Sequence, residues 1–150
     1  MSFKNYIVRS MNETDLDDVL AIENTCYSTP WSSRQFLDEL QNRAASILLC
    51  EMDDSIVGYI CYWLIDGEMQ ILNIATAPQM RRQGIGELLL ERAFADCCQT
   101  GLNSVWLEVR AGNSGAIKLY QRNGFKRNGI RRGYYRDGED AVLMFKEFTC

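Results

Sequence analysis

Three apolar segments, separated only by very short polar turns, constrain the fold of this chain most. They span residues 46–52, 56–65 and 68–77, and only "DDS" and "DG" lie between them. Asp-Gly between two apolar runs is a strong signal for a tight β-hairpin. The chain is therefore expected to form three consecutive antiparallel strands at this point.

The segment after these strands predicts a parallel crossover. Pro78 ends the third strand, because proline cannot donate to a strand ladder. A helix is expected over 84–99, followed by a short buried strand at 104–110, "SVWLEVR". A strand, a helix and a second strand in this order favour a parallel, right-handed connection.

The remaining elements complete a mixed α/β pattern. Their predicted ranges are a strand at 5–11, helices at 14–26 and 29–40, a helix at 113–123, and strands near 125–132 and 141–148. The element order is therefore β-α-α-β-β-β-α-β-α-β-β. Because the sequence has no repeat, linker or low-complexity segment, residues 1–150 are expected to form a single domain.

Capping residues set the predicted helix starts. Thr14, with Asp17 three residues on, is expected to cap the first helix, and Ser32, with Gln35, the second. In the first helix Glu23 shares a face with apolar residues. That face comprises Leu16, Val19, Leu20 and Glu23.

Charge and hydropathy limit the classes of protein that fit. The net charge is −4, whereas a protein that binds nucleic acid directly normally carries a basic surface. The N-terminal ten residues lack the apolar region of a signal peptide. The longest apolar run, at 56–65, is too short to span a bilayer. A cytoplasmic protein that binds neither nucleic acid nor membrane is expected.

The cysteines and the lack of histidine restrict the chemistry further. The chain has six cysteines and no histidine, so zinc sites built from Cys and His, and Cys-His or Ser-His dyads, are excluded. No metal is expected. No two cysteines form a C-x-x-C pair, and we expect reduced, mostly buried thiols. A structural disulfide framework is the alternative.

The stretch "MRRQGIG" at 80–86 combines two arginines and two glycines at the start of a helix. One interpretation is an anion site, in which backbone amides and the helix N-terminus hold a phosphate. The other is a strand-to-helix turn with a positive φ angle and solvated arginines. Leu89 stands where a dinucleotide-binding G-x-G-x-x-G would have its last glycine, and no Walker A lysine follows.

Two further residues have both a structural and a chemical interpretation. Glu108 interrupts an apolar strand, and it either faces solvent or serves as a general base. Tyr120 shares helical spacing with Ile117 and precedes Phe125, and it is either a core aromatic or a proton donor.

Taken together, the motifs resemble those of the GNAT family of acyl-CoA-dependent N-acetyltransferases. The similarity rests on "LNIATAP", the glycine loop, "VWLEVRAGN" and "AIKLYQRNGF", and it covers residues 68–125. It continues through "IRRGYY" and "EDAVLMF" to the end. Within the family, these pieces and "PWS" at 30–32 are most similar to the RimI group, which acetylates the N-terminal alanine of ribosomal protein S18.

This resemblance implies the GNAT fold, a mixed central β-sheet splayed between two parallel strands, here 68–77 and 104–110, with helices on both faces. It implies acetyl-CoA as co-substrate. The glycine loop and its arginines would hold the pyrophosphate, and pantetheine would pair with main-chain groups near 74–76 like an extra strand. The implied cofactor-binding residues are Ile74, Ala75, Thr76, Arg81, Arg82, Gln83, Gly84, Ile85, Gly86, Glu87, Asn113 and Tyr120.

The resemblance also implies roles in the reaction. Glu108 matches the general base, acting through a water, and Tyr120 matches the general acid that protonates the departing CoA thiolate. The acceptor amine would attack the thioester directly in a ternary complex. Loops that border the acceptor groove in this family carry Tyr27, Trp31, Tyr134 and Tyr135, whose alternative interpretation is partial burial of amphipathic aromatics.

The expected acceptor is a protein N-terminus. An α-amino group has a pKa near 8, against about 10.4 for lysine, so a modest base suffices to deprotonate it. Acetylation of lysine side chains, polyamines or another small amine is the alternative within enzymes. A non-catalytic acyl-CoA-binding module is a third hypothesis, disfavoured because Glu108 and Tyr120 are both present.

Overall fold

A single mixed sheet organises the computed structural model, which describes residues 5–150. Its order is β1-β2-β3-β4-β5-β7-β6, and only β4 and β5 pair in parallel. The strands are β1 (Tyr6–Ser10), β2 (Ala45–Met52), β3 (Ser55–Ile65), β4 (Glu68–Thr76), β5 (Ser104–Arg110), β6 (Lys126–Arg131) and β7 (Ala141–Glu147). Residues 1–4, part of the stretch expected not to be a signal peptide, lie outside the described residues.

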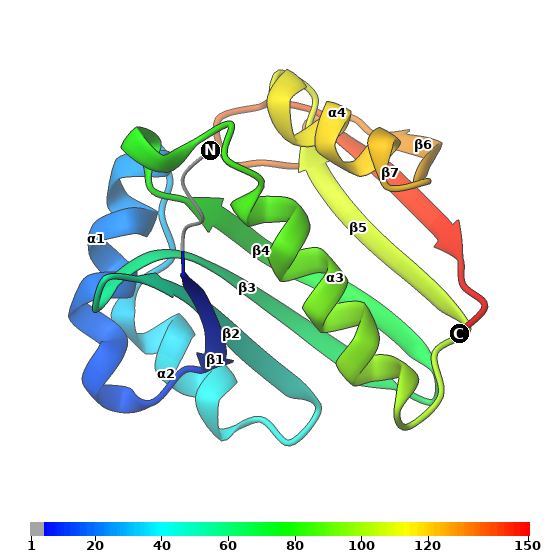
Figure 1. Cartoon of the computed structure of the whole chain (residues 1–150). Coiled ribbons are helices and arrows are strands. Elements are labelled where there is room, and N and C mark those ends of the chain that lie inside the picture. The colour runs from blue at the N-terminus through cyan, green and yellow to red at the C-terminus, as the bar shows by residue number, and fades with distance from the viewer. Residues whose placement is uncertain (1–4) are drawn as a thin grey trace.

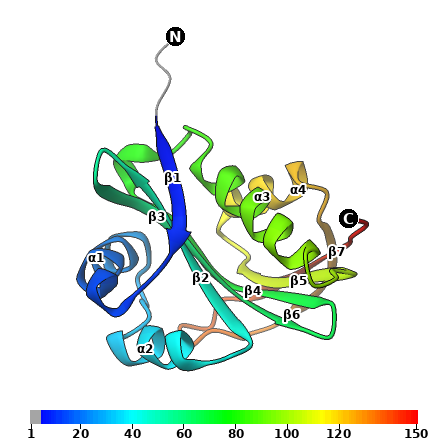
Figure 2. The same ribbon diagram turned by 60° about the horizontal axis from the view of Figure 1, so that its bottom comes forward.

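Helices cover both faces of the sheet (Figure 2). They are α1 (Leu16–Cys26), α2 (Ser33–Gln41), α3 (Ile85–Cys98) and α4 (Ser114–Arg122). The first two lie on one face, and α3 and α4 lie on the other. Within residues 5–150, no helix is both long and apolar enough to cross a membrane. The predicted element order and mixed α/β class are confirmed.

The central strands are buried because helices lie on both sides of them. Leu49 of β2, Tyr59 and Ile60 of β3, and Leu89 and Leu90 of α3 are essentially inaccessible to solvent. A strand covered on both faces needs apolar side chains at consecutive positions rather than at alternate ones. This accounts for the unbroken apolar runs in the sequence.

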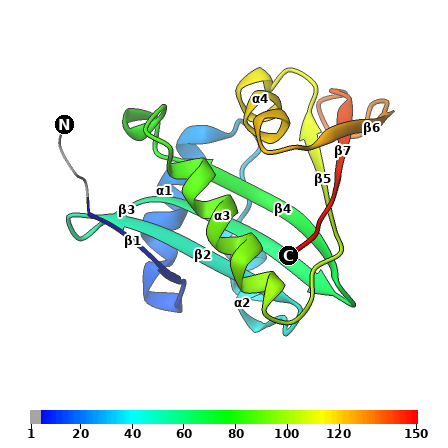
Figure 3. The same ribbon diagram turned by 45° about the vertical axis from the view of Figure 1, so that its right-hand side comes forward.

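The sheet opens between its two parallel strands (Figures 1 and 3). The ladder between β4 and β5 runs only from Glu68–Ser104 to Ile71–Leu107. The pairing of β3 with β4 shifts register at the same point, which leaves Leu72 as an extra residue. A bulge of this kind bends a strand, and the rest of β4 diverges from β5.

One predicted helix cap is wrong and one is confirmed. The first helical segment is capped by Asn12, which accepts a hydrogen bond from the amide of Thr14, while Asp15 accepts one from the Asn12 amide. A 3₁₀ turn (Glu13–Asp15) therefore precedes α1, and Thr14 is not the cap. Ser32 caps α2 through the predicted capping box.

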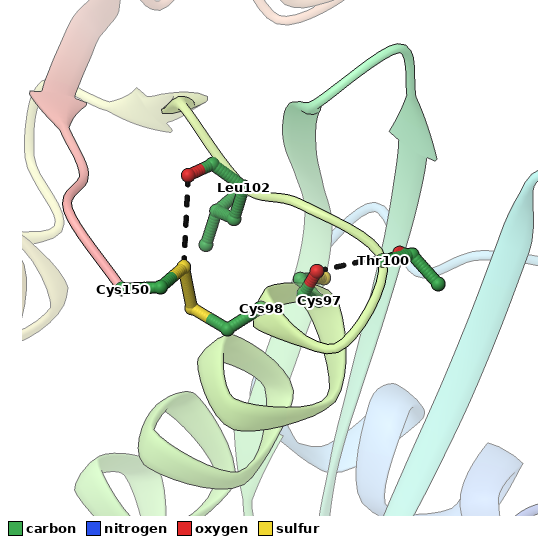
Figure 4. Close-up of a disulfide and its surroundings, with 5 residues drawn as sticks. All are labelled: Cys97, Cys98, Thr100, Leu102 and Cys150. Atoms are coloured by element: carbon green, nitrogen blue, oxygen red, sulfur yellow. Dashed lines mark hydrogen bonds between the residues drawn. A yellow bond between two sulfur atoms is a disulfide. The ribbon is translucent and has the colours of Figure 1, made fainter.

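The expectation that all thiols are reduced is wrong for two cysteines. Cys98, the last residue of α3, forms a disulfide with Cys150 (Figure 4). Their Cα atoms lie 5.7 Å apart although 52 residues separate them in sequence. The reason is topological: β7 runs antiparallel to β5 and brings the end of the chain to the C-terminal end of α3. Of the four free cysteines, Cys26 is partly exposed and the others are buried.

Candidate active site

The glycine loop opens α3 with main-chain donors that have no partner in the helix. Gly84 is the N-cap, with φ at +81°, and no side chain caps the helix. The first α-helical hydrogen bond runs from the amide of Leu88 to the Gly84 carbonyl, so the three preceding amides are left over. Arg82 also has a positive φ, +62°. Successive residues with alternating helical hand direct their amides into one concavity, which suits an anion.

The two glycines of the loop have different tasks. A Cβ at Gly84 would meet nothing within 4 Å, so this glycine is needed for its left-handed φ. A Cβ at Gly86 would lie 3.0 Å from a methyl group of Leu119 in α4. Gly86 therefore allows α3 and α4 to approach closely. The turn and the anion-site interpretations of the loop are compatible.

A cleft of about 1190 Å³ lies in front of this loop. We call it the donor cleft. Most residues assigned to the cofactor line it, namely Ile74, Ala75, Thr76, Arg81, Arg82, Gly84, Ile85, Gly86, Glu87 and Asn113. Two do not: Gln83 accepts a hydrogen bond from the Tyr6 hydroxyl instead, and Tyr120 lines the neighbouring cleft.

The open part of β4 points main-chain groups toward α1. The carbonyl of Ile74 accepts a hydrogen bond from the Tyr27 hydroxyl, and the carbonyl of Thr76 accepts one from the thiol of Cys26. These carbonyls lie where β4 has left β5, so β5 does not pair with them. Such groups can pair with an amide-rich ligand that lies along the strand.

A second cleft, of about 810 Å³, adjoins the first. We call it the acceptor cleft. The two clefts share five lining residues, namely Tyr27, Ile74, Arg110, Asn113 and Ala116. The acceptor cleft also contains both predicted catalytic residues and all four predicted aromatic residues: Glu108, Tyr120, Tyr27, Trp31, Tyr134 and Tyr135.

Glu108 lies on the less buried face of β5, beside the acceptor cleft. Buried and partly exposed side chains alternate along this strand, and Val109 and Leu107 are on the buried face. The Glu108 side chain is 23% exposed, and its carboxylate lies 3.9 Å from the guanidinium of Arg131. A hydrogen bond to Glu108 raises the pKa of Tyr134. The carboxylate is therefore reachable from the cleft.

Tyr120 is both a core residue and a cleft residue. Its ring packs edge-on against Phe125, and the residue is 4% exposed. Within residues 5–150, no hydrogen bond is found for the Tyr120 hydroxyl. Every polar side-chain atom there that is closed off from solvent has a partner, so this hydroxyl is not closed off. The hydroxyl therefore reaches the cleft. Burial raises the pKa of Tyr120 well above its usual range, so the phenol keeps its proton.

The aromatic loop at 133–136 is held from β5. The Arg110 guanidinium lies 4.0 Å from the centre of the Tyr135 ring and forms ion pairs with Asp137 and Glu139. The rings of Tyr134 and Tyr135 meet edge-on at 5.1 Å. These contacts fix one wall of the acceptor cleft, which Tyr27 and Trp31 also line.

Sequence reasoning missed several residues of the site. Glu23 and Asn73 line the acceptor cleft, Arg110 lines both clefts, and Cys26 lines the donor cleft. For Glu23 a signal was present, because a carboxylate on an apolar helix face needs a buried partner. The other three carry no local pattern. The described residues contain no cluster of three or more potential metal ligands.

Comparison with known proteins agrees with this geometry. The model of the acetyltransferase (GNAT) family matches residues 16–125. The chain belongs to the GNAT acetyltransferase family. Acetyl-CoA is the co-substrate of these enzymes, and the uncapped α3 amides, Arg81, Arg82 and the open edge of β4 suit its pyrophosphate and its amide-rich arm.

Relatives match over nearly the whole chain. A Bacillus subtilis protein, provisionally named [ribosomal protein bS18]-alanine N-acetyltransferase, is 39% identical over 92% of this chain and 93% of its own. The Escherichia coli protein of that name is 36% identical over 91% and 94%. The crystal structure of the Escherichia coli ribosomal-protein-S18-alanine N-acetyltransferase superposes with a TM-score of 0.89, at 32% identity, covering 97% of this chain and 96% of that one.

Proposed function

We propose that this acetyltransferase modifies the N-terminal α-amine of a protein, and that its acceptor is the N-terminal alanine of ribosomal protein S18. The observation that carries the proposal is the acceptor cleft. It combines a carboxylate, a protonated phenol and four aromatic side chains, and it joins the donor cleft at Tyr27 and Ile74. Relatives whose names state this acceptor match over nine-tenths of the chain.

The roles of the two central residues follow from their environments. Glu108, accessible at the cleft, accepts the proton that the amine releases as its nitrogen bonds to the acetyl carbon. Tyr120, neutral because of its burial, gives its hydroxyl proton to the CoA sulfur as the carbon–sulfur bond breaks. The acetyl group passes directly to the amine, and no cysteine is needed as a nucleophile.

The clefts favour an arrangement in which both substrates are present together. Because the donor and acceptor clefts meet, the amine can reach the thioester without a movement of the sheet. A carboxylate base deprotonates an N-terminal amine more readily than a lysine side chain, since the pKa of the α-amine is lower by roughly two units. We further propose that residues 1–150 act as one catalytic domain in the cytoplasm. The single sheet supports the proposal of one domain.

The experiment is a peptide panel with acetyl-CoA and product mass as the readout. It contains a peptide that begins Ala-Arg, the same peptide with a blocked N-terminus and an internal lysine, and a polyamine. We expect one acetyl group on the free alanine peptide and none on the blocked one. Transfer to the polyamine or to the lysine, with no transfer to any free N-terminus, would overturn the proposal.

A further inference from the structure

Glu23 is a buried carboxylate that no cation neutralises. It is 1% exposed, and Asp15 is the other buried charged residue between residues 5 and 150. Asp15 pairs with the Arg9 guanidinium at 2.8 Å. None of the ion pairs found among the described residues includes Glu23. Burying an unpaired charge is costly, so its position requires an explanation.

Three hydrogen-bond donors from three parts of the chain surround this carboxylate. The main-chain amide of Trp31, in the loop before α2, donates to Oε2 at 2.7 Å. The Asn73 amide group, on β4, donates to Oε1 at 2.8 Å, and the Tyr59 hydroxyl of β3 donates to the same oxygen. Burial raises the pKa of Tyr59 well above its usual range, and the nearby charge of Glu23 raises it further.

Two of these donors belong to residues that line the acceptor cleft. Asn73 follows the bulge at Leu72 and is among the first residues of β4 beyond its ladder with β5. Glu23, Trp31 and Asn73 all line the acceptor cleft, and none of them lines the donor cleft. One carboxylate thus joins two segments that line the acceptor cleft, the loop before α2 and the open part of β4.

We propose that Glu23 is a positioning residue for the acceptor. Its carboxylate holds the loop of Trp31 against the open part of β4, so the acceptor cleft has one shape before a substrate arrives. Although Glu23 borders the acceptor cleft, it is only 1% exposed, so it acts through Trp31 and Asn73. This inference takes its acceptor, a protein N-terminus, from the proposed function and rests on it.

The Glu23→Gln variant tests this inference because glutamine has nearly the same shape. Its single carbonyl oxygen can serve Asn73 and Tyr59, which leaves its NH₂ group facing the Trp31 amide, donor against donor. The KM for the alanine peptide should rise about tenfold, the scale of one lost hydrogen bond to a charged group. The KM for acetyl-CoA should not change. The thermal midpoint should change little, because the unpaired Trp31 amide costs stability while removal of a buried charge relieves its desolvation.

Asp15→Asn is the matched control, since it neutralises the other buried carboxylate, which lies outside both clefts. That variant should lower the thermal midpoint and leave both KM values unchanged. Hydrogen exchange of the Trp31 amide, measured without substrate, is the second readout. It should be faster in Glu23→Gln than in the wild type and unchanged in Asp15→Asn.

The outcomes separate this inference from the proposed function. A Glu23→Gln variant with a lower midpoint and equal changes in both KM values would show a merely structural role and overturn the inference. Unchanged Trp31 exchange would also overturn it. If the wild type acetylates no N-terminal peptide, the proposed function fails, while the exchange measurement still decides the role of Glu23.

Discussion

Reduction of the Cys98–Cys150 disulfide is expected to destabilise the protein without affecting its catalysis. The bond closes a loop with a sequence separation of 52 residues. In the chain-entropy description, a closed loop of this length removes enough freedom from the unfolded chain to stabilise the fold by about 4 kcal/mol. For a chain of 150 residues, such a loss lowers the thermal midpoint by roughly 10 °C.

The assay is thermal unfolding followed by circular dichroism, with and without a reductant, and with thiols counted in denaturant. The count should rise from the four free cysteines to all six. The Cys150→Ser variant should start at the lower midpoint and show no further change on reduction. Both KM values should stay constant, because the bond lies at the end of α3 remote from Gly84. A midpoint that stays constant while the thiol count reaches six would refute the reasoning.

Three other predictions concern single side chains. Glu108→Gln and Tyr120→Phe should each lower kcat by on the order of a hundredfold or more, while calorimetry finds acetyl-CoA binding unchanged; wild-type turnover in both would remove them as base and acid. Alkylation of Cys26, the one partly exposed free thiol of the described chain, should block activity by filling the donor cleft. Acetyl-CoA should protect against this, Cys26→Ser should resist it, and full activity after complete alkylation would contradict the placement. Its hydrogen bond with Arg9 lowers the pKa of Asp15, so this residue stabilises the fold above about pH 4, its unfolded pKa. That contribution is lost as the pH falls through the lower folded pKa. Acid unfolding of Asp15→Asn should therefore start from a lower stability and depend less on pH, and parallel acid titrations of the two proteins would speak against the pairing.

Local signals predicted the elements of the fold because each depends on neighbouring residues. The turn at 66–67, the helix cap at Ser32 and the apolar runs of the central strands are all properties of short windows. The first helix shows the limit of this method. Asn12 with Asp15 and Thr14 with Asp17 both have capping-box spacing, and only the 3₁₀ turn that precedes α1 decides between them.

The features that sequence reasoning missed depend on contacts between distant segments. Cys98 and Cys150 meet only because of the path of β7, and Glu23 meets Asn73 across 50 positions of the chain. Gly86 likewise shows its task only when α4 is in place. The catalytic assignments of Glu108 and Tyr120 came from family motifs and not from periodicity, and they stay predictions.

The four-pair ladder between β4 and β5 leaves the sheet unfinished in the interior of the molecule. If acetyl-CoA completes it, the donor contributes to folding as well as to catalysis, because a ligand that binds only the native state stabilises it by mass action. At a hundred times its Kd this amounts to about 2.7 kcal/mol. Proteases in the cell degrade the unfolded fraction of a protein. The lifetime of the enzyme would then follow the cellular supply of CoA, whether acetylated or free, because the groups that complete the sheet belong to CoA itself.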